Sequence, residues 1–207
     1  MITACLVKYC ESPSAETQYD KTVSFLRRFM PVIEYDNTSK NIGLVKARNI
    51  LLKRVKTGAV LFCDFDIDII GDVTDFDFSS MAEYSKFGIV SARVHKPQCN
   101  CDLGDYRFVK MPHLQNCFNI IQTKKLIDAG GYDERYHTYC ADWDLIKRLD
   151  TPMYQYNAVN VIHYSESKKS DIRAELCKHD FAEYTQKWGT FERFPENAFI
   201  CNAEGIC

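Results

Sequence analysis

The stretch from Val60 to Ile70, VLFCDFDIDII, carries the strongest evidence on the fold of this sequence. Its first residues are apolar without polar alternation, a pattern typical of a strand that is buried on both faces. Three carboxylates, Asp64, Asp66 and Asp68, follow where that strand reaches the surface. Placing them there is costly unless a positive group binds them, and ligands of open α/β sheets bind at the carboxyl ends of strands. The stretch therefore predicts a binding site at the edge of an α/β sheet.

Two interpretations of these carboxylates are open at this point. Closely spaced oxygen ligands suit Mg²⁺ or Mn²⁺, and a phosphate-bearing substrate would complete the coordination shell. The alternative is an acidic surface turn, because aspartate is common in turns. The first interpretation predicts a metal–diphosphate site, whereas the second predicts no ligand.

The composition is that of an ordinary globular domain. The chain has 207 residues, of which 46% are hydrophobic and 26% are charged, enough for one domain with a sizeable core. A formal net charge of -2 argues against nucleic-acid binding through a basic surface. No apolar stretch approaches the roughly 20 residues that span a bilayer, and the N-terminus lacks the basic and apolar regions of a signal peptide. We therefore expect a cytoplasmic protein without a membrane anchor.

The 10 cysteines allow two interpretations. Four of them lie within apolar segments, where a free thiol acts as a small hydrophobe: Cys5, Cys63, Cys117 and Cys140. Without a secretory signal, free thiols are expected rather than a disulfide framework. The alternative for part of the set is a zinc site built from Cys99, Cys101, His95 and His113. That C-x-C pair lacks the second pair of a usual zinc motif, so free thiols are favoured.

Strand and helix patterns alternate along the chain. Strands are expected at residues 2–9, 32–35, 59–63, 87–94 and 117–121, and within 153–164 with an end at His163. A long loop is expected at 95–110. Helices are expected at 13–29, 44–55, around 126–127, at 142–149 and at 171–188. This order predicts one α/β domain over residues 1–189, with a mostly parallel central sheet flanked by helices. Residues 190–207 are expected to form an irregular tail.

Four segments, each weak alone, form a specific series through their order and spacing. Along the chain they are Asn41–Asn49 (NIGLVKARN), Asp64–Asp66 (DFD), Gly130–Glu134 (GGYDE) with Asp142–Leu145 (DWDL), and Val161–His163 (VIH) with Lys187–Gly189 (KWG). They resemble the motifs of the nucleotide-sugar-dependent glycosyltransferases of the GT-A fold, particularly the family-two group. The matching motifs are N-x-G-x-x-x-A-R-N, DxD, GG[FY]DE before an E-D-x-D-L helix, and a late V-x-H and K-W-G. The resemblance covers residues 1–189 and implies the Rossmann-like GT-A fold.

The resemblance implies a metal and donor site at the carboxyl edge of the sheet. Asp66 is then a direct ligand of Mn²⁺ or Mg²⁺, while Asp64 binds the ribose or reaches the metal through water. His163 is implied as a third ligand, although a lone histidine at a strand end is more often simply hydrogen-bonded. Asp36 is implied to bind the nucleotide base. Tyr9 stacks on that base or is a tyrosine at the edge of the core.

The resemblance also assigns the catalytic base to Asp142, at the start of a helix after a glycine-rich turn. Ala141 stands where the family usually has glutamate, which is a departure from the pattern. Arg48 faces the nucleotide or the loop bearing Asp64, or else it is a solvated helix residue. Trp143 either forms an acceptor platform for a sugar or packs in the core. Asp144 is interpreted as structural, because aspartate is favoured in the first turn of a helix. Asp68 is a carboxylate that the family pattern does not require, and it is interpreted as a solvent-facing turn residue. Lys168 and Lys169 lie on a polar loop that closes over the diphosphate or is ordinary surface.

The predicted function is metal-dependent transfer of a sugar from a nucleoside diphosphate, UDP in preference to GDP, to an acceptor hydroxyl, most simply on a glycan. Direct displacement with inversion is favoured by the family resemblance. One alternative is a phosphohydrolase of the haloacid dehalogenase type, in which a strand also ends in DxD. However, the Gly-Thr or Gly-Val that normally follows is missing here, and the strand is not N-terminal. Another alternative is a non-catalytic module that binds a nucleotide sugar.

Overall fold

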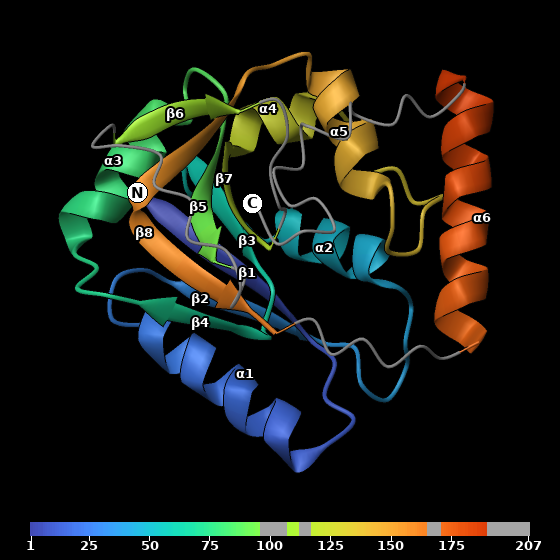
Figure 1. The fold of residues 1–207 in the computed structure, drawn as a ribbon, viewed down its shortest axis with the longest axis horizontal. Coiled ribbons are helices and arrows are strands. Elements are labelled where there is room, and N and C mark those ends of the chain that lie inside the picture. The colour runs from blue at the N-terminus through green and yellow to red at the C-terminus, as the bar shows by residue number, and fades with distance from the viewer. Residues whose placement is uncertain (96–106, 112–116, 165–170, 190–207) are drawn as a thin grey trace, which may run out of the picture.

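A computed structural model describes residues 1–95, 107–111, 117–164 and 171–189 of the protein. One eight-stranded sheet forms its centre, in the order β2-β1-β3-β7-β5-β8-β4, and β6 pairs with β8 beside this path (Figure 1). The strands are β1 (Ile2–Lys8), β2 (Val32–Asp36), β3 (Ala59–Cys63), β4 (Ile67–Ile70), β5 (Ile89–His95), β6 (Phe108–Met111), β7 (Phe118–Gln122) and β8 (Met153–His163). The helices are α1 (Pro13–Leu26), α2 (Leu44–Leu52), α3 (Asp75–Tyr84), α4 (Thr123–Asp128), α5 (Ala141–Leu149) and α6 (Asp171–Trp188).

The predicted α/β fold with a helix-flanked sheet is confirmed, and the sheet is mixed in its pairings. Parallel pairs join β1 to β2, β1 to β3, and β5 to β8. Antiparallel pairs join β7 to both β3 and β5, and β8 to both β4 and β6. As a result β1, β2, β3, β5 and β8 all run in one direction, against β4, β6 and β7. The carboxyl ends of the larger group therefore meet at one edge of the sheet.

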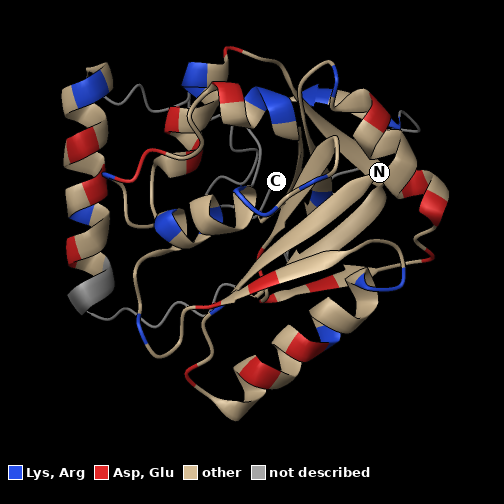
Figure 2. Ribbon diagram, turned by 180° about the vertical axis from the view of Figure 1, so that it is seen from behind, with Lys and Arg blue, Asp and Glu red and all other residues tan. Residues whose placement is uncertain are grey.

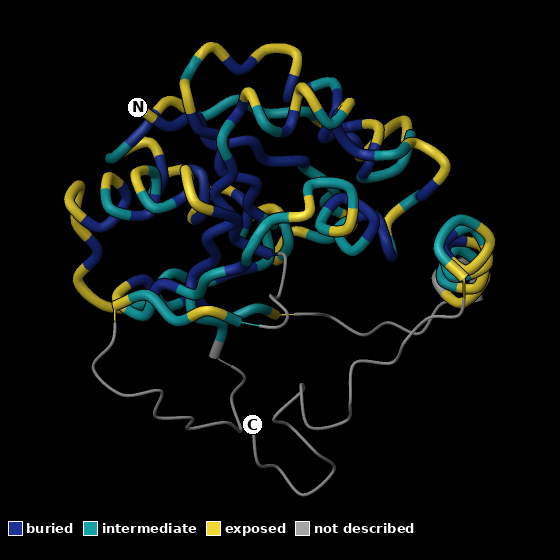
Figure 3. The backbone as a smooth tube through the Cα atoms, turned by 90° about the horizontal axis from the view of Figure 1, so that it is seen from above, coloured by how far each residue is buried: buried dark blue, intermediate teal, exposed yellow. Residues whose placement is uncertain are grey.

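Strand β3 shows why the sheet is covered on both faces. All of its side chains are buried, as its continuous apolar run predicts. Ala59, Leu61 and Cys63 face a core that also contains buried side chains of α1 and α3. Val60 and Phe62 face a second core that contains side chains of α2, α4 and α5. Figure 3 shows the buried residues concentrated in the central strands, and Figure 2 shows these strands nearly free of charge, with the charged residues mostly on helices and loops.

The N-terminus of α1 forms as the sequence predicts. The Ser12 hydroxyl accepts a hydrogen bond from the Ala15 backbone N–H at 3.2 Å, and Pro13 occupies the first turn. The helix ends at Leu26, three residues before the predicted end at residue 29. The other predicted helices and strands are present with small shifts of their ends.

Three elements were not predicted. Helix α3 begins at a capping box between Thr74 and Asp77, and its short apolar stripe gave no clear helical signal. Strand β6 begins at Phe108, inside residues 95–110, which were predicted as a loop. Strand β4 has four residues and forms through its pairing with β8, a partner almost 100 residues away that local patterns do not reveal.

Asp68 belongs to β4 and not to a solvent-facing turn. Its carboxylate accepts hydrogen bonds from Lys21, from Gln18 at 3.1 Å and from Tyr164 at 2.8 Å. These contacts join α1 to the end of β8, so the third carboxylate of the stretch has a structural role in addition to its charge.

The structure bears on the predictions about the cysteines and about a membrane-spanning helix. Cys5, Cys63, Cys117 and Cys140 are free and buried, as expected. The zinc alternative lies outside the described residues, which include neither Cys99, Cys101 nor His113, and so do the loop with Lys168 and Lys169 and the tail 190–207. Among the helices in the described ranges, none has both the length and the apolar character to cross a bilayer. The cytoplasmic location stays a prediction.

Two of the sequence motifs hold each other in place across the second core. The Asn49 side-chain amide donates to the Tyr132 carbonyl at 2.8 Å, and its oxygen accepts from the Tyr132 backbone N–H at 2.9 Å. A β-carbon added to Gly131 would lie 2.7 Å from that Asn49 oxygen, and Gly131 has a φ of +74°. The glycine thus lets the turn after α4 approach α2 closely enough for both hydrogen bonds.

We predict that Gly131→Ala destabilises the protein markedly more than Gly130→Ala does. Both glycines have positive φ, which costs an alanine about 1–2 kcal/mol, but only Gly131 also meets a neighbour, since nothing lies within 4 Å of a β-carbon at Gly130. The loss of the Asn49 contacts should add about 1–3 kcal/mol for Gly131→Ala. Urea unfolding of both variants checks this, and equal losses would show that the close approach is unimportant.

Candidate active site

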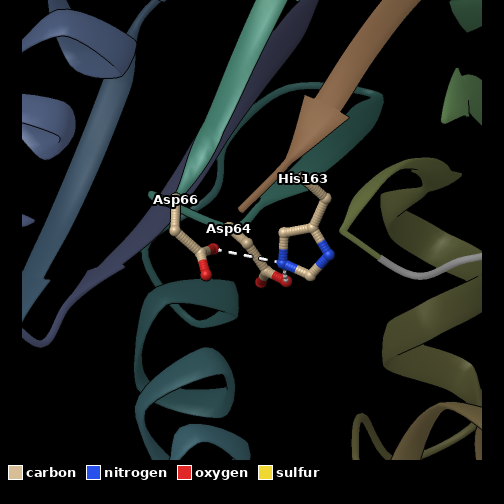
Figure 4. A group of neighbouring side chains, drawn as sticks. All are labelled: Asp64, Asp66 and His163. Carbon is tan, nitrogen blue, oxygen red and sulfur yellow. Dashed lines mark ion pairs between the residues drawn. The ribbon is translucent and has the colours of Figure 1, made fainter. Parts of the chain in front are cut away.

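Three side chains form a cluster that suits a divalent cation at the carboxyl edge of the sheet. Asp64, Asp66 and His163 each offer one ligand atom, and these atoms lie within 4.8 Å of one another (Figure 4). His163 Nε2 is 3.2 Å from Asp66 Oδ1 and 3.8 Å from Asp64 Oδ2. Two carboxylates and one imidazole are a donor set that Mn²⁺ accepts. The residues present therefore fit the predicted metal.

Backbone pairing brings these three residues together. The Asp64 N–H donates to the Cys117 carbonyl at 2.8 Å, which anchors the end of β3 against the chain entering β7. The Tyr164 N–H donates to the Asp66 carbonyl at 2.8 Å, and His163 pairs with Ile67 in the β4–β8 ladder. The return of the chain through β4 thus sets His163 beside the two aspartates, although about 100 residues separate them in the sequence.

Within this cluster the pKa values of both Asp64 and His163 are raised. Burial, together with the nearby Asp66, raises the pKa of Asp64 to about 6, although Arg48 and His163 oppose the shift. Burial disfavours the charged imidazole of His163, but hydrogen bonding to Asp66 and the charge of Asp64 outweigh it and raise the His163 pKa above its usual value. Protons would therefore compete with a cation for both side chains as the pH falls towards 6.

Arg48 links the metal cluster to the candidate base. Its guanidinium donates from Nη2 to Asp64 Oδ1 at 2.9 Å and from Nη1 to Asp142 Oδ1 at 3.1 Å. The Arg48 side chain is 5% exposed, so it is not the solvated helix residue of the second interpretation. Its guanidinium carbon lies 5.6 Å from the centre of the Phe62 ring and 5.4 Å from that of Tyr132.

The environment of Arg48 keeps it charged. Burial disfavours its charge, but the acidic groups Tyr132, Asp142 and Asp64 outweigh burial and raise the Arg48 pKa above its ordinary value. One fixed positive charge thus partly neutralises two carboxylates, one just after strand β3 and the other in helix α5.

Asp142 lies in the first turn of α5, as the sequence predicts. Its carboxylate accepts a hydrogen bond from Arg48, and burial raises its pKa above the usual value, although Arg48 and Tyr132 oppose the shift. Its side chain remains 25% exposed, the same fraction as that of Asp64, so both carboxylates are accessible from the edge of the sheet. Tyr132 was not predicted as a contact of the base. Its position within the GGYDE segment is the signal that would have pointed to it.

The neighbours of Asp142 on α5 face helix α6. Trp143 lies against the rings of Phe181 and Tyr184, with centres 6.1 and 6.3 Å apart. This geometry supports the packing interpretation of Trp143 and provides no observation for an acceptor platform. Asp144 is fully buried and accepts hydrogen bonds within α5 and from α6, in agreement with its predicted structural role.

Tyr9 and Asp36 lie at the same edge of the sheet, at the ends of β1 and β2. Asp36 is exposed, pairs in register with Lys8, and accepts a hydrogen bond from the Thr38 N–H at 2.9 Å. The Tyr9 hydroxyl donates to Glu11 at 2.6 Å. Their position beyond the carboxyl ends of two neighbouring parallel strands is compatible with a nucleoside site, and their role stays a prediction.

We predict that Mn²⁺ affinity falls steeply between pH 7.5 and pH 5.5. The pKa of Asp64 is about 6 and that of His163 is raised, so protons increasingly compete for both ligands as the pH falls through this range. Each competing proton costs up to about tenfold in affinity per pH unit below its pKa, so a total loss of roughly one to two orders of magnitude is expected. Calorimetric titration with MnCl₂ at several pH values measures it.

The variant His163→Gln provides the control for this prediction, because glutamine does not titrate. It should bind Mn²⁺ more weakly at pH 7.5 and show a shallower dependence on pH. Equal wild-type affinity at both ends of the pH range would contradict the assignment of these ligands.

Comparisons with known proteins agree in fold alone. No protein-family model matches the sequence, and neither does any curated protein. Among solved structures, GalNAc-T7 with UDP, GalNAc and Mn²⁺ superposes with a TM-score of 0.62 at 9% identity, over 99% of this chain and 51% of that one. The mannosyltransferase PcManGT from Pyrobaculum calidifontis, in complex with GDP-Man and Mn²⁺, gives 0.58 at 13% identity, over 89% of this chain and 64% of that one.

A third similar structure is S. aureus TarS 1–349 in complex with UDP, with a TM-score of 0.52 at 13% identity, over 89% of this chain and 65% of that one. The present chain thus spans 51% to 65% of the length of these three structures. The predicted resemblance is confirmed at the level of the fold: the protein has the fold of the GT-A nucleotide-sugar glycosyltransferases.

Proposed function

We propose that the protein is a metal-dependent glycosyltransferase that moves a sugar from a nucleoside diphosphate to an acceptor hydroxyl. The observation that carries this proposal is the cluster of Asp64, Asp66 and His163 at the carboxyl edge of a GT-A fold, joined through Arg48 to Asp142. A bound Mn²⁺ or Mg²⁺ neutralises charge on the diphosphate and on the leaving group. Two similar structures, one with UDP, GalNAc and Mn²⁺ and one with GDP-Man and Mn²⁺, support this choice of ligands.

The residues of the chain divide the work of donor binding. Asp66 and His163 hold the metal, and Asp64 contributes through its Oδ2 because Arg48 occupies Oδ1. Asp36 and Tyr9, beyond the ends of β2 and β1, bind the nucleoside. We favour UDP as the nucleotide, since two of the three similar structures are bound to it.

Asp142 acts as the general base. Its raised pKa favours proton acceptance, because a stronger base takes a hydroxyl proton more readily. Arg48 Nη1 donates to Oδ1 of Asp142 and so fixes the orientation of the carboxylate. The other oxygen, Oδ2, then accepts the proton of the acceptor hydroxyl. A base on the acceptor side favours direct displacement with inversion of the anomeric carbon. Because alanine stands at position 141, Asp142 is the carboxylate that remains of the family's Glu-Asp pair.

The two alternatives from the sequence predict other behaviour. A haloacid dehalogenase-type reaction needs the first aspartate as a nucleophile, whereas Asp64 Oδ1 is held by a buried arginine. The fold also differs from that expectation, since it superposes on glycosyltransferases. A non-catalytic module would bind the donor without turnover. The raised pKa and partial exposure of Asp142 favour an active site.

We predict that UDP binding requires a divalent cation and is lost in Asp66→Ala. Removing a direct ligand leaves the diphosphate without its neutralising ion, so the affinity should fall by more than about a hundredfold. Calorimetry with UDP in Mn²⁺ or in EDTA measures this. Asp68→Asn is the matched control, because Asp68 contacts α1 and Tyr164 and should leave the affinity unchanged. Equal UDP affinity in EDTA would reject the metal–diphosphate site.

We further predict that Asp142→Asn keeps Mn²⁺–UDP affinity but lowers turnover by a factor of about 10² to 10⁴, because an amide cannot accept the proton. Release of nucleotide from a panel of UDP- and GDP-sugars, with water or added glycans as acceptor, measures turnover. Asp150→Asn, an exposed change at the far end of the same helix, is the control. Undiminished turnover in Asp142→Asn would remove the base assignment, and retention of the anomeric configuration, followed by NMR, would exclude direct displacement.

A further inference from the structure

Helix α6 carries a fully buried carboxylate that the proposed chemistry does not use. Asp180 is 0% exposed and accepts hydrogen bonds from three consecutive backbone N–H groups. The donors are His137 at 3.0 Å, Thr138 at 2.9 Å and Tyr139 at 2.7 Å. His179 Nδ1 lies 3.0 Å from the same carboxylate. Burying a carboxylate is costly, and several N–H donors on one anion are what offsets that cost.

The segment that Asp180 binds leads directly to the candidate base. Cys140 follows it, with a φ of 58°, in the left-handed region that a non-glycine residue enters at a cost of about 1–3 kcal/mol. Ala141 begins α5, and Asp142 follows in its first turn. The same segment is bonded to α2, the helix that carries Arg48, because the Val45 N–H donates to the His137 carbonyl at 3.4 Å. The path and angle at which α5 begins therefore depend on residues 137–140.

Helix α6 holds the residues after Asp142 as well. Asp144 is 0% exposed and accepts from Lys187 at 2.6 Å and from the Trp188 indole N–H at 2.9 Å. Lys187 also donates to Asp133 of the glycine-rich turn at 2.8 Å. Figures 1 and 3 show α6 at the margin of the molecule beside α5, away from the sheet. Its buried polar contacts are thus directed at the segment that carries Asp142.

We propose that Asp180 is a positioning residue for the base: by binding the backbone of residues 137–139, it fixes Cys140 in its strained conformation and sets Asp142 at its place beside Arg48. The proposal rests on the proposed function, in which Asp142 receives the acceptor proton. A displacement of about 1 Å at a reacting group costs up to about a hundredfold in rate. Loss of the Asp180 carboxylate should therefore lower turnover while leaving the metal and UDP site, built on β3 and β8, intact.

The test compares Asp180→Asn with Glu175→Gln, which removes an exposed carboxylate from the same helix. Asparagine keeps the size but removes the negative charge, and it replaces Oδ1, which accepts from the His137 N–H, by an NH₂ group that can only donate. We expect faster hydrogen exchange in residues 137–142 and a fall of about 10- to 100-fold in kcat for UDP-sugar turnover. The KM for the donor and the Mn²⁺–UDP affinity should stay within about twofold, and Glu175→Gln should match the wild type.

A second variant guards against loss of folding. Asp180→Gly leaves a space next to three N–H donors, and added formate should restore both the slow exchange of residues 137–142 and the turnover. An unchanged kcat in Asp180→Asn despite faster hydrogen exchange would overturn the proposal. A fall in kcat accompanied by a proportionate fall in UDP affinity or in melting temperature would also overturn it. A wild-type protein that binds Mn²⁺–UDP without any turnover would instead overturn the proposed function.

Discussion

The buried guanidinium of Arg48, held between Asp64 and Asp142, is the interaction on which the site depends. A buried charge is strongly destabilising without partners, and removing one member of such a pair typically costs about 3–5 kcal/mol. Arg48 therefore forces the end of β3 and the start of α5 to stay together. The guanidinium also lies against the rings of Phe62 and Tyr132, so Arg48 contacts both the hydrophobic core and the carboxylates of the candidate active site.

The mixed sheet supplies the second constraint. Strand β7 runs between β3 and β5 in the opposite direction, and β8 runs parallel to β5, so the chain returns to the edge where β3 ends. The antiparallel β4–β8 pair then places His163 beside Asp66. The proposed metal ligands come from distant parts of the sequence and meet because the strands fix them, and this rigidity suits a binding site.

Much of this arrangement could be predicted from residues whose patterns are local. The apolar run of β3 identified a strand buried on both faces, and the glycine-rich turn with the DWDL segment placed Asp142 in the first turn of a helix. The resemblance to GT-A glycosyltransferases predicted Arg48 and His163 near the aspartates, and both lie beside Asp64. These predictions concern residues in or beside a motif, where the residue types and the local geometry indicate the same arrangement.

Other features depend on contacts that no local pattern contains. Strand β4 exists through its pairing with β8, and Asp68 was therefore interpreted as a turn residue although it belongs to a strand. The choice between packing and acceptor contact at Trp143 required knowing that α6 lies beside it. Asp180 sits in the middle of a helix whose sequence reads as an ordinary amphipathic element, and its role is visible only through the backbone groups of residues 137–139.

We propose that Asp64, Asp66 and His163 form a metal site that binds a nucleoside diphosphate. Anomalous diffraction from crystals soaked with MnCl₂ and UDP tests it most directly, because Mn²⁺ is located independently of the protein atoms. We expect one anomalous peak at coordination distance, about 2.0–2.4 Å, from Asp66 and His163, with the diphosphate oxygens completing the shell. UDP bound at the edge of the sheet with no peak between these residues, or a peak at a different set of ligands, would contradict it.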